Sequence, residues 1–155
     1  MKETAKLPVT QSETAKTGIA PQPVFTRILA LTDFSHRSQA AVEYAAQLAR
    51  STHARLTLLH VLPPPSAFDY TMGGLEAVKK LAEERTRIKA NYGEVDSTLR
   101  TGINIHDEII SVAREIAADL LVVSTHGDTG WNHFLFGSDA AKIVRDAPCP
   151  ILVVR

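Results

Sequence analysis

The chain has 155 residues and a mass of 16.9 kDa, the size of one ordinary domain, and its composition of 45% apolar and 22% charged residues excludes a disordered chain. Seventeen Lys plus Arg balance seventeen Asp plus Glu, which argues against a dedicated nucleic-acid-binding protein because such proteins carry excess positive charge. The apolar runs are too short to span a membrane and the N-terminus has no signal-peptide core, so we expect a cytoplasmic protein without membrane contact.

Residues 1–24 differ from the rest of the chain. They are rich in Thr, Lys, Glu and Gln, contain three of the prolines and show no periodic apolar pattern. We therefore expect a flexible N-terminal tail over residues 1–24 and one folded domain over residues 25–155.

Five short runs predict strands at residues 28–31, 56–62, 95–100, 120–124 and 151–154. The third run is more polar, which suits an edge of the sheet. Helical spacing of apolar residues predicts a helix capped by Ser35 with Ala41, Tyr44, Ala45 and Leu48 inward, and, after a loop over residues 63–73, a helix with Leu75, Val78, Leu81, Ala82 and Ile88 inward. A third helix, capped by Asn104, would bury Ile105, Ile109, Val112, Ala113 and Ile116, and a fourth would cover residues 138–146.

The alternation of strands and helices predicts the α/β class: a Rossmann-like parallel sheet covered by helices on both faces. Crossover helices join parallel strands, and the strands are continuously apolar, as burial on both faces requires. With the strand order 3-2-1-4-5, the first and fourth strands are neighbours.

Ligands of open α/β sheets bind beyond the carboxyl ends of the strands, where the strand order reverses. Residues 32–35 follow the first strand and residues 124–130 follow the fourth, so both segments are candidates for a site. Asp33 has two readings of about equal weight. It can stabilise a turn, or it can accept hydrogen bonds from a sugar hydroxyl or a base amine.

Nine residues separate Gly127 from Gly137, and Ser138 then opens a predicted helix, whose unpaired amides can hold phosphate. Taken alone, this pattern more often marks the start of a helix with Ser138 as its cap. The common phosphate-binding fingerprints, the Walker sequence and Gly-x-Gly-x-x-Gly, are absent from the sequence.

From Arg27 to Arg155 the chain resembles the universal stress protein family. The resemblance rests on residues 31–35, 58–61, 119–127, 136–138 and 147–154, taken in this order and spacing. ATP-binding members carry a glycine, two residues, a glycine, nine residues, a glycine and then Ser or Thr. Here Ser124, Gly127, Gly137 and Ser138 match that register, with Ser124 in place of the first glycine.

The resemblance implies a nucleotide site that takes ATP, alone or with magnesium. Asp33 would lie near the adenosine, the backbone of Val61 would face the adenine edge, and Gly137 and Ser138 would hold phosphate. The full set of implied binding residues is Leu31, Thr32, Asp33, Val61, Val123, Ser124, His126, Gly127, Gly137, Ser138, Asp139 and Ala140.

The chain departs from the family pattern at Ser124, at Asp128, where relatives commonly have a basic residue, and at Asp139, where a small or apolar residue is usual. A carboxylate beside a phosphate costs binding energy, and magnesium would offset that cost. The departures motivate the alternative of an interaction protein with the same fold that binds no ATP.

We expect a regulatory, stress-response binding module rather than an enzyme, with at most slow ATP hydrolysis or self-phosphorylation at Ser138 or Thr129. No catalytic residue or metal ligand is assigned, since the six histidines lack metal-ligand spacing; His60 is expected in the core or at its rim, and Cys149 in a packing role. Ile151–Val154 lacks charge and proline, so this edge strand is expected to form a homodimer, as family members commonly do there.

Overall fold

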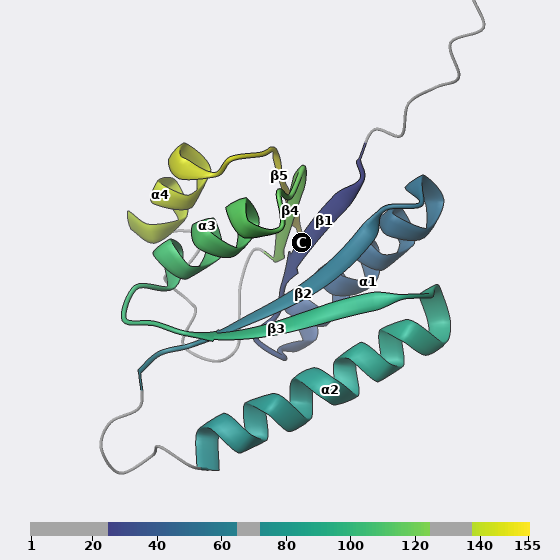
Figure 1. Ribbon diagram of the computed structural model, residues 1–155, viewed down its shortest axis with the longest axis horizontal. Helices are drawn as coiled ribbons and strands as arrows, with labels where there is room; N and C mark the ends of the chain where they lie inside the picture. Colours follow the sequence, from purple (N-terminus) through teal and green to yellow (C-terminus); the bar gives the residue numbers. More distant parts are fainter. Residues whose placement is uncertain (1–24, 65–71, 125–137) are drawn as a thin grey trace, which may run out of the picture.

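A computed structural model describes residues 25–64, 72–124 and 138–155 (Figure 1). The elements run β1 (Arg27–Leu31), α1 (His36–Thr52), β2 (Arg55–Leu62), α2 (Met72–Tyr92), β3 (Val95–Thr101), α3 (Ile105–Glu115), β4 (Leu120–Ser124), α4 (Ser138–Asp146) and β5 (Ile151–Val154). The five strands form one parallel sheet in the order β3-β2-β1-β4-β5, which confirms the predicted fold. The predicted tail, residues 1–24, lies outside the described residues.

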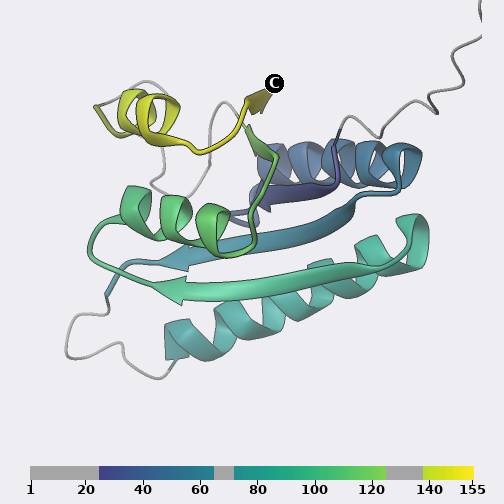
Figure 2. The same ribbon diagram turned by 45° about the horizontal axis from the view of Figure 1, so that its top comes forward.

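Strand β1 lies at the centre of the sheet and is buried on both faces. Its side chains alternate between two cores: Ile28 and Ala30 pack with α1 and α2, whereas Leu29 and Leu31 pack with α3 and α4. The two pairs of helices accordingly cover opposite faces of the sheet (Figures 1 and 2). The continuous apolar run of β1 follows from this double burial.

The predicted inward faces of two helices are partly wrong. Tyr44 of α1 is exposed, and on α2 the side chains of Leu75, Val78 and Ala82 point outward. At about 100° per residue, these positions lie far around their helices from the side chains that are buried. The buried stripes are Ser38, Ala41, Val42, Ala45, Ala46 and Ala49 on α1 and Ala77, Leu81, Glu84 and Ile88 on α2.

Two helix caps were predicted, and each residue occupies its cap position. The Ser35 hydroxyl accepts a hydrogen bond from the Ser38 amide at 3.2 Å, as an N-cap does. Asn104 also precedes its helix, but its side chain donates to Asp107 Oδ2 at 2.8 Å instead of capping a backbone amide. Helix α2 begins at Met72, so its first two residues fall within the loop predicted over residues 63–73.

Asp119 fastens the entry of β1 to the entry of β4. Its carboxylate accepts hydrogen bonds from the Thr26 amide at 2.8 Å, the Thr26 hydroxyl at 2.6 Å and the Arg27 amide at 2.9 Å. Burial opposes ionisation, but these bonds outweigh it and lower the pKa of Asp119. The charged form of Asp119 therefore stabilises the fold above its unfolded pKa, and this contribution is lost as the pH falls through the lower folded pKa.

We predict that Asp119→Ala lowers the free energy of unfolding by about 1–2 kcal/mol at neutral pH, because it leaves three donors without this acceptor near the surface. Urea denaturation measures the change. Asp96→Ala is the matched control, because Asp96 is exposed on the edge strand β3 and its loss should change little. Equal stability of the wild type and Asp119→Ala would contradict this role of Asp119.

Candidate functional site

The sheet brings the carboxyl ends of β1, β2 and β4 to one edge. Strand β1 pairs with β2, where Leu31 lies opposite Leu59, and with β4, where Ala30 lies opposite Val122. The predicted site residues at these ends (Leu31, Thr32, Asp33, Val61, Val123 and Ser124) therefore lie on neighbouring strands or just beyond them.

The apolar members of this set do not offer their side chains to a ligand. Leu31, Val61 and Val123 are buried in the core beneath α3 and α4. Only their backbone groups could contact a bound molecule, which agrees with the backbone role predicted for Val61. Among the described residues, side-chain chemistry at this edge can come from the polar residues that follow β1 and from Ser124 at the end of β4.

Asp33 is only 6% exposed and forms the turn between β1 and α1. Its Oδ1 accepts a hydrogen bond from the Ser35 amide at 3.0 Å, which is the turn-stabilising role considered above. The structure thus holds the carboxylate in a fixed place at the end of β1. A carboxylate so placed is suited to accept hydrogen bonds from a ligand hydroxyl or amine.

The Ser38 hydroxyl organises the same turn from inside α1. It donates to the Ser35 carbonyl at 3.0 Å, and its oxygen lies 3.3 Å from the Asp33 amide and 3.4 Å from the Thr32 hydroxyl. The Thr32 hydroxyl in turn accepts a hydrogen bond from the Phe34 amide at 3.1 Å. Thr32, Asp33, Ser35 and Ser38 are all buried, so this network fixes the turn away from water.

Phe34 occupies the left-handed region with φ of 65°, a conformation that costs energy for a bulky residue. Its ring packs against the ring of His60, with 4.3 Å between the centroids. His60 Nδ1 lies 2.7 Å from the Thr32 carbonyl oxygen, and because a carbonyl only accepts, Nδ1 carries the hydrogen. Burial lowers the pKa of His60, which keeps the ring neutral at physiological pH. His60 is thus a core residue, as expected, and it ties the turn to β2.

The phosphate half of the predicted site is described only in part. His126, Gly127 and Gly137 lie outside the described residues. Ser138, Asp139 and Ala140 open helix α4, so the predicted helix start is confirmed.

Metal ligands and the free thiol of Cys149 are further candidates for chemistry in the described part of the chain. Residues 25–64, 72–124 and 138–155 contain no group of three or more His, Cys, Asp or Glu side chains that could hold a metal ion. Burial raises the pKa of the half-buried Cys149 thiol, which disfavours its reactive thiolate form. None of the helices described has the length and apolar content that a membrane crossing needs.

Sequence reasoning missed Glu84 of α2. This residue is only 6% exposed and lines a cavity of about 300 Å³ together with Phe34, Gln39, Lys80, Glu83 and Arg87. Its position was a usable signal, because Leu81, Glu84 and Ile88 follow one another at helical spacing. An acidic residue within an apolar stripe indicates a buried charge that needs an explanation.

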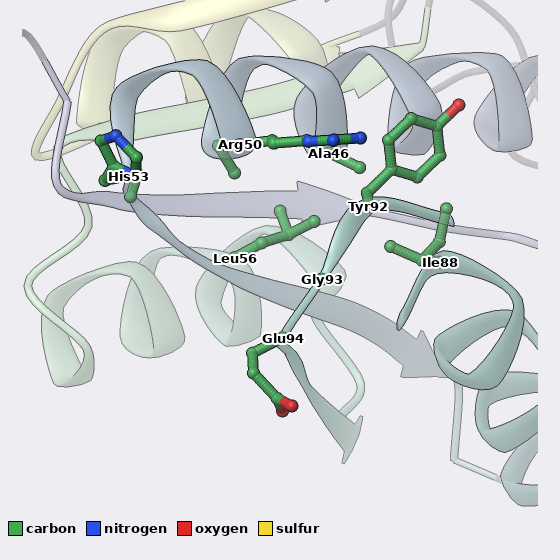
Figure 3. A pocket seen from close by; sticks show the side chains of 10 residues that line it. Ala46, Arg50, His53, Leu56, Ile88, Tyr92, Gly93 and Glu94 are labelled. Atoms are coloured by element: carbon green, nitrogen blue, oxygen red, sulfur yellow. The ribbon is translucent and has the colours of Figure 1, made fainter. Parts of the chain in front are cut away.

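A second cavity, of about 390 Å³, lies at the opposite end of the sheet (Figure 3). Leu56 and Ile88 contribute apolar surface, while Arg50 and His53 border it from the end of α1. Its charged side chains are exposed, and Glu94 is paired with Lys89 at 2.9 Å. These lining residues therefore include no buried charged or polar side chain that could bind a ligand, whereas the turn after β1 does.

Comparison with known proteins agrees with this architecture. The model of the universal stress protein family matches residues 25–155. A Staphylococcus aureus (strain USA300) protein assigned to the universal stress proteins is 31% identical over 140 residues, which cover 84% of each chain.

Solved structures show the same fold. A universal stress protein in complex with cAMP is 26% identical, with a TM-score of 0.68 over 85% of this chain and 98% of that one. The universal stress protein UspA from Lactobacillus plantarum is 25% identical, with a TM-score of 0.69 over 84% of this chain and 97% of that one. The family model, the relatives and the fold agree, and the chain belongs to the universal stress protein family.

Proposed function

We propose that this protein binds ATP at the carboxyl edge of the sheet and acts in the stress response as a regulatory binding module. The observation that carries the proposal is the buried Asp33 carboxylate, fixed at the end of β1 beside β4. Asp33 and the backbone of Val61 would contact adenosine. The segment from Ser124 to Ser138 would hold the phosphates, with Gly127 and Gly137 allowing close approach.

Two observations support a nucleotide as the ligand. A relative of the same fold and 26% identity has been solved with cAMP, an adenine nucleotide. The matching register ends with Gly137 and Ser138, and Ser138 is the first residue of α4. A helix start favours phosphate through its free amides and partial positive charge. Asp139 adds a negative charge there, and magnesium bridging to the phosphates would offset it.

We predict that ATP with magnesium binds the purified full-length protein and that Asp33→Ala weakens binding roughly tenfold or more, because it removes a charged hydrogen-bond acceptor. Isothermal titration calorimetry measures both affinities. Asp96→Ala should bind as the wild type does, since Asp96 is exposed at the far edge of the sheet. Absence of heat and of competition at millimolar nucleotide would overturn the proposal.

The competing function is an interaction protein that binds no ATP, and the acidic residues Asp128 and Asp139 favour it. The double variant Asp128→Arg, Asp139→Val separates the two. ATP binding by the variant but not by the wild type would identify the acidic residues as a block and favour the interaction protein. Equal binding by both would remove the reason for this alternative.

We also propose a homodimer through β5. This strand is the outermost on its side of the sheet, and Val153 is 47% exposed. An apolar edge with unpaired backbone groups is normally covered or paired, and a two-fold axis pairs it with itself.

The cytoplasmic location expected from the sequence stays a prediction.

Val153→Lys should convert the dimer to a monomer, because it places a charge on the apolar edge while leaving Ile151, which packs against the core, unchanged. Sedimentation equilibrium gives the mass. Asp96→Lys on the opposite edge strand should remain dimeric. A wild-type mass of one chain would refute the dimer, and a dimeric Val153→Lys variant would place its interface elsewhere.

A further inference from the structure

Glu84 is a buried carboxyl group for which the described residues provide no well-formed hydrogen bond. Within residues 25–64, 72–124 and 138–155, neither Glu84 oxygen has a partner at hydrogen-bond distance and angle, and both oxygens are inaccessible to water. Arg87 Nη2 lies 3.8 Å from Glu84 Oε1, which is beyond hydrogen-bond distance. Buried polar groups in native proteins are almost always paired, so this arrangement is costly for an ionised carboxylate and far less costly for a neutral carboxyl.

The surroundings of Glu84 favour the neutral form. Burial raises the pKa of Glu84, and it outweighs the Thr32 hydroxyl and the Arg87 charge, which lower the pKa. The carboxylates of Asp33 and Glu43 raise the pKa further. The charged and titratable groups around this site are Asp33 and His60 at the strand ends, Glu43 on α1, and Lys80, Glu83 and Arg87 on α2.

Thr32 connects Glu84 to the turn that holds Asp33. The Thr32 hydroxyl has one hydrogen to donate, while its oxygen already accepts from the Phe34 amide. The Ser38 hydroxyl donates its own hydrogen to the Ser35 carbonyl. The Thr32 hydroxyl can therefore donate its hydrogen either to the Ser38 oxygen, 3.4 Å away, or to the Glu84 carboxylate. An ionised carboxylate only accepts and attracts that hydrogen, whereas a neutral carboxyl can donate and leaves it to Ser38.

We propose that Glu84 is a positioning residue for the nucleotide site. When Glu84 is neutral, the Thr32 hydroxyl donates its hydrogen bond to Ser38, and this bond maintains the turn that presents Asp33. When Glu84 loses its proton, the hydroxyl turns away from Ser38 and a second negative charge appears beside Asp33. Ligand affinity at Asp33 then falls. This inference rests on the proposed function. It means that a residue of α2 changes the ligand affinity of a site formed at the ends of the strands.

The charge state of Glu84 is tested first, by unfolding at several pH values. A carboxyl whose folded pKa is raised contributes its full stability below the unfolded pKa, and the contribution is lost as the pH rises through the folded pKa. The Glu84→Gln variant cannot ionise at this position. Its free energy of unfolding should therefore rise relative to that of the wild type as the pH increases above 4.5, the ordinary pKa of a glutamate side chain. A difference between the two proteins that does not change with pH would overturn the inference.

The effect on binding is tested with adenosine, which lacks phosphates whose charge would change with pH. Calorimetry between about pH 5 and pH 8 should show wild-type affinity falling roughly 2- to 10-fold as the pH rises, the size of one hydrogen bond. Glu84→Gln should keep the low-pH affinity throughout, because its amide stays neutral. Glu83→Gln is the matched control, since Glu83 is the exposed neighbour of Glu84 and should retain the wild-type profile.

Nuclear magnetic resonance of the free protein separates a failure of this inference from a failure of the proposed function. The amide signals of Asp33, Phe34 and Ser35 should titrate together with the Glu84 carboxyl carbon, whether or not any nucleotide binds. If adenosine does not bind but these amides still titrate together with Glu84, nucleotide binding is refuted and the coupling between Glu84 and the turn is supported. Titration of Glu84 without any movement of these amides, or an unchanged pH profile in Glu84→Gln, would overturn the coupling.

Discussion

Burial of β1 on both faces is the constraint on which the rest of the structure depends. Ile28, Leu29 and Ala30 are fully buried, and they supply side chains to both cores. A strand in this position must be covered on both faces, which the helices do here, and both of its neighbours run parallel to it. Its carboxyl end therefore opens between β2 and β4, and whatever follows Leu31 is held at the edge where the strand order reverses.

The chain uses this place for polar groups that are costly to bury. Thr32, Asp33, Ser35 and Ser38 are buried within one hydrogen-bonded turn, and His60 adds a bond to the Thr32 carbonyl. Such a network defines the geometry more tightly than apolar packing would, because each donor and acceptor has a required direction. Rigid placement of a carboxylate lowers the entropic cost of binding a ligand to it.

Much of the fold could be predicted from the sequence, because continuous apolar strands alternating with helices allow few arrangements. The faces of α1 and α2 could not, because Leu75 and Val78 satisfy helical spacing as well as Leu81 and Ile88 do. Only the packing of α2 against β2, β3 and α1 selects the stripe that contains Glu84. A prediction that counts only the spacing of apolar residues takes no account of Glu84, the acidic residue between Leu81 and Ile88.

The candidate site divides in the same way. Asp33 and Ser35 were predictable, since turn and cap residues have strong local preferences. The left-handed Phe34 was not, because such a conformation is rare for an aromatic residue and depends on its packing with His60. The role of the Ser38 hydroxyl was not predictable either, because it depends on how the folded turn places Thr32 and Asp33 beside the first turn of α1.

The most direct test of the central claim is a titration of the isotope-labelled protein with ATP and magnesium, followed by amide chemical shifts. Binding at the carboxyl edge predicts that the largest changes fall on residues 32–35, on Ser124 and at the start of α4. Changes confined to Arg50, His53 and Gly93, around the cavity at the other end of the sheet (Figure 3), would contradict the account, as would unchanged signals at millimolar nucleotide.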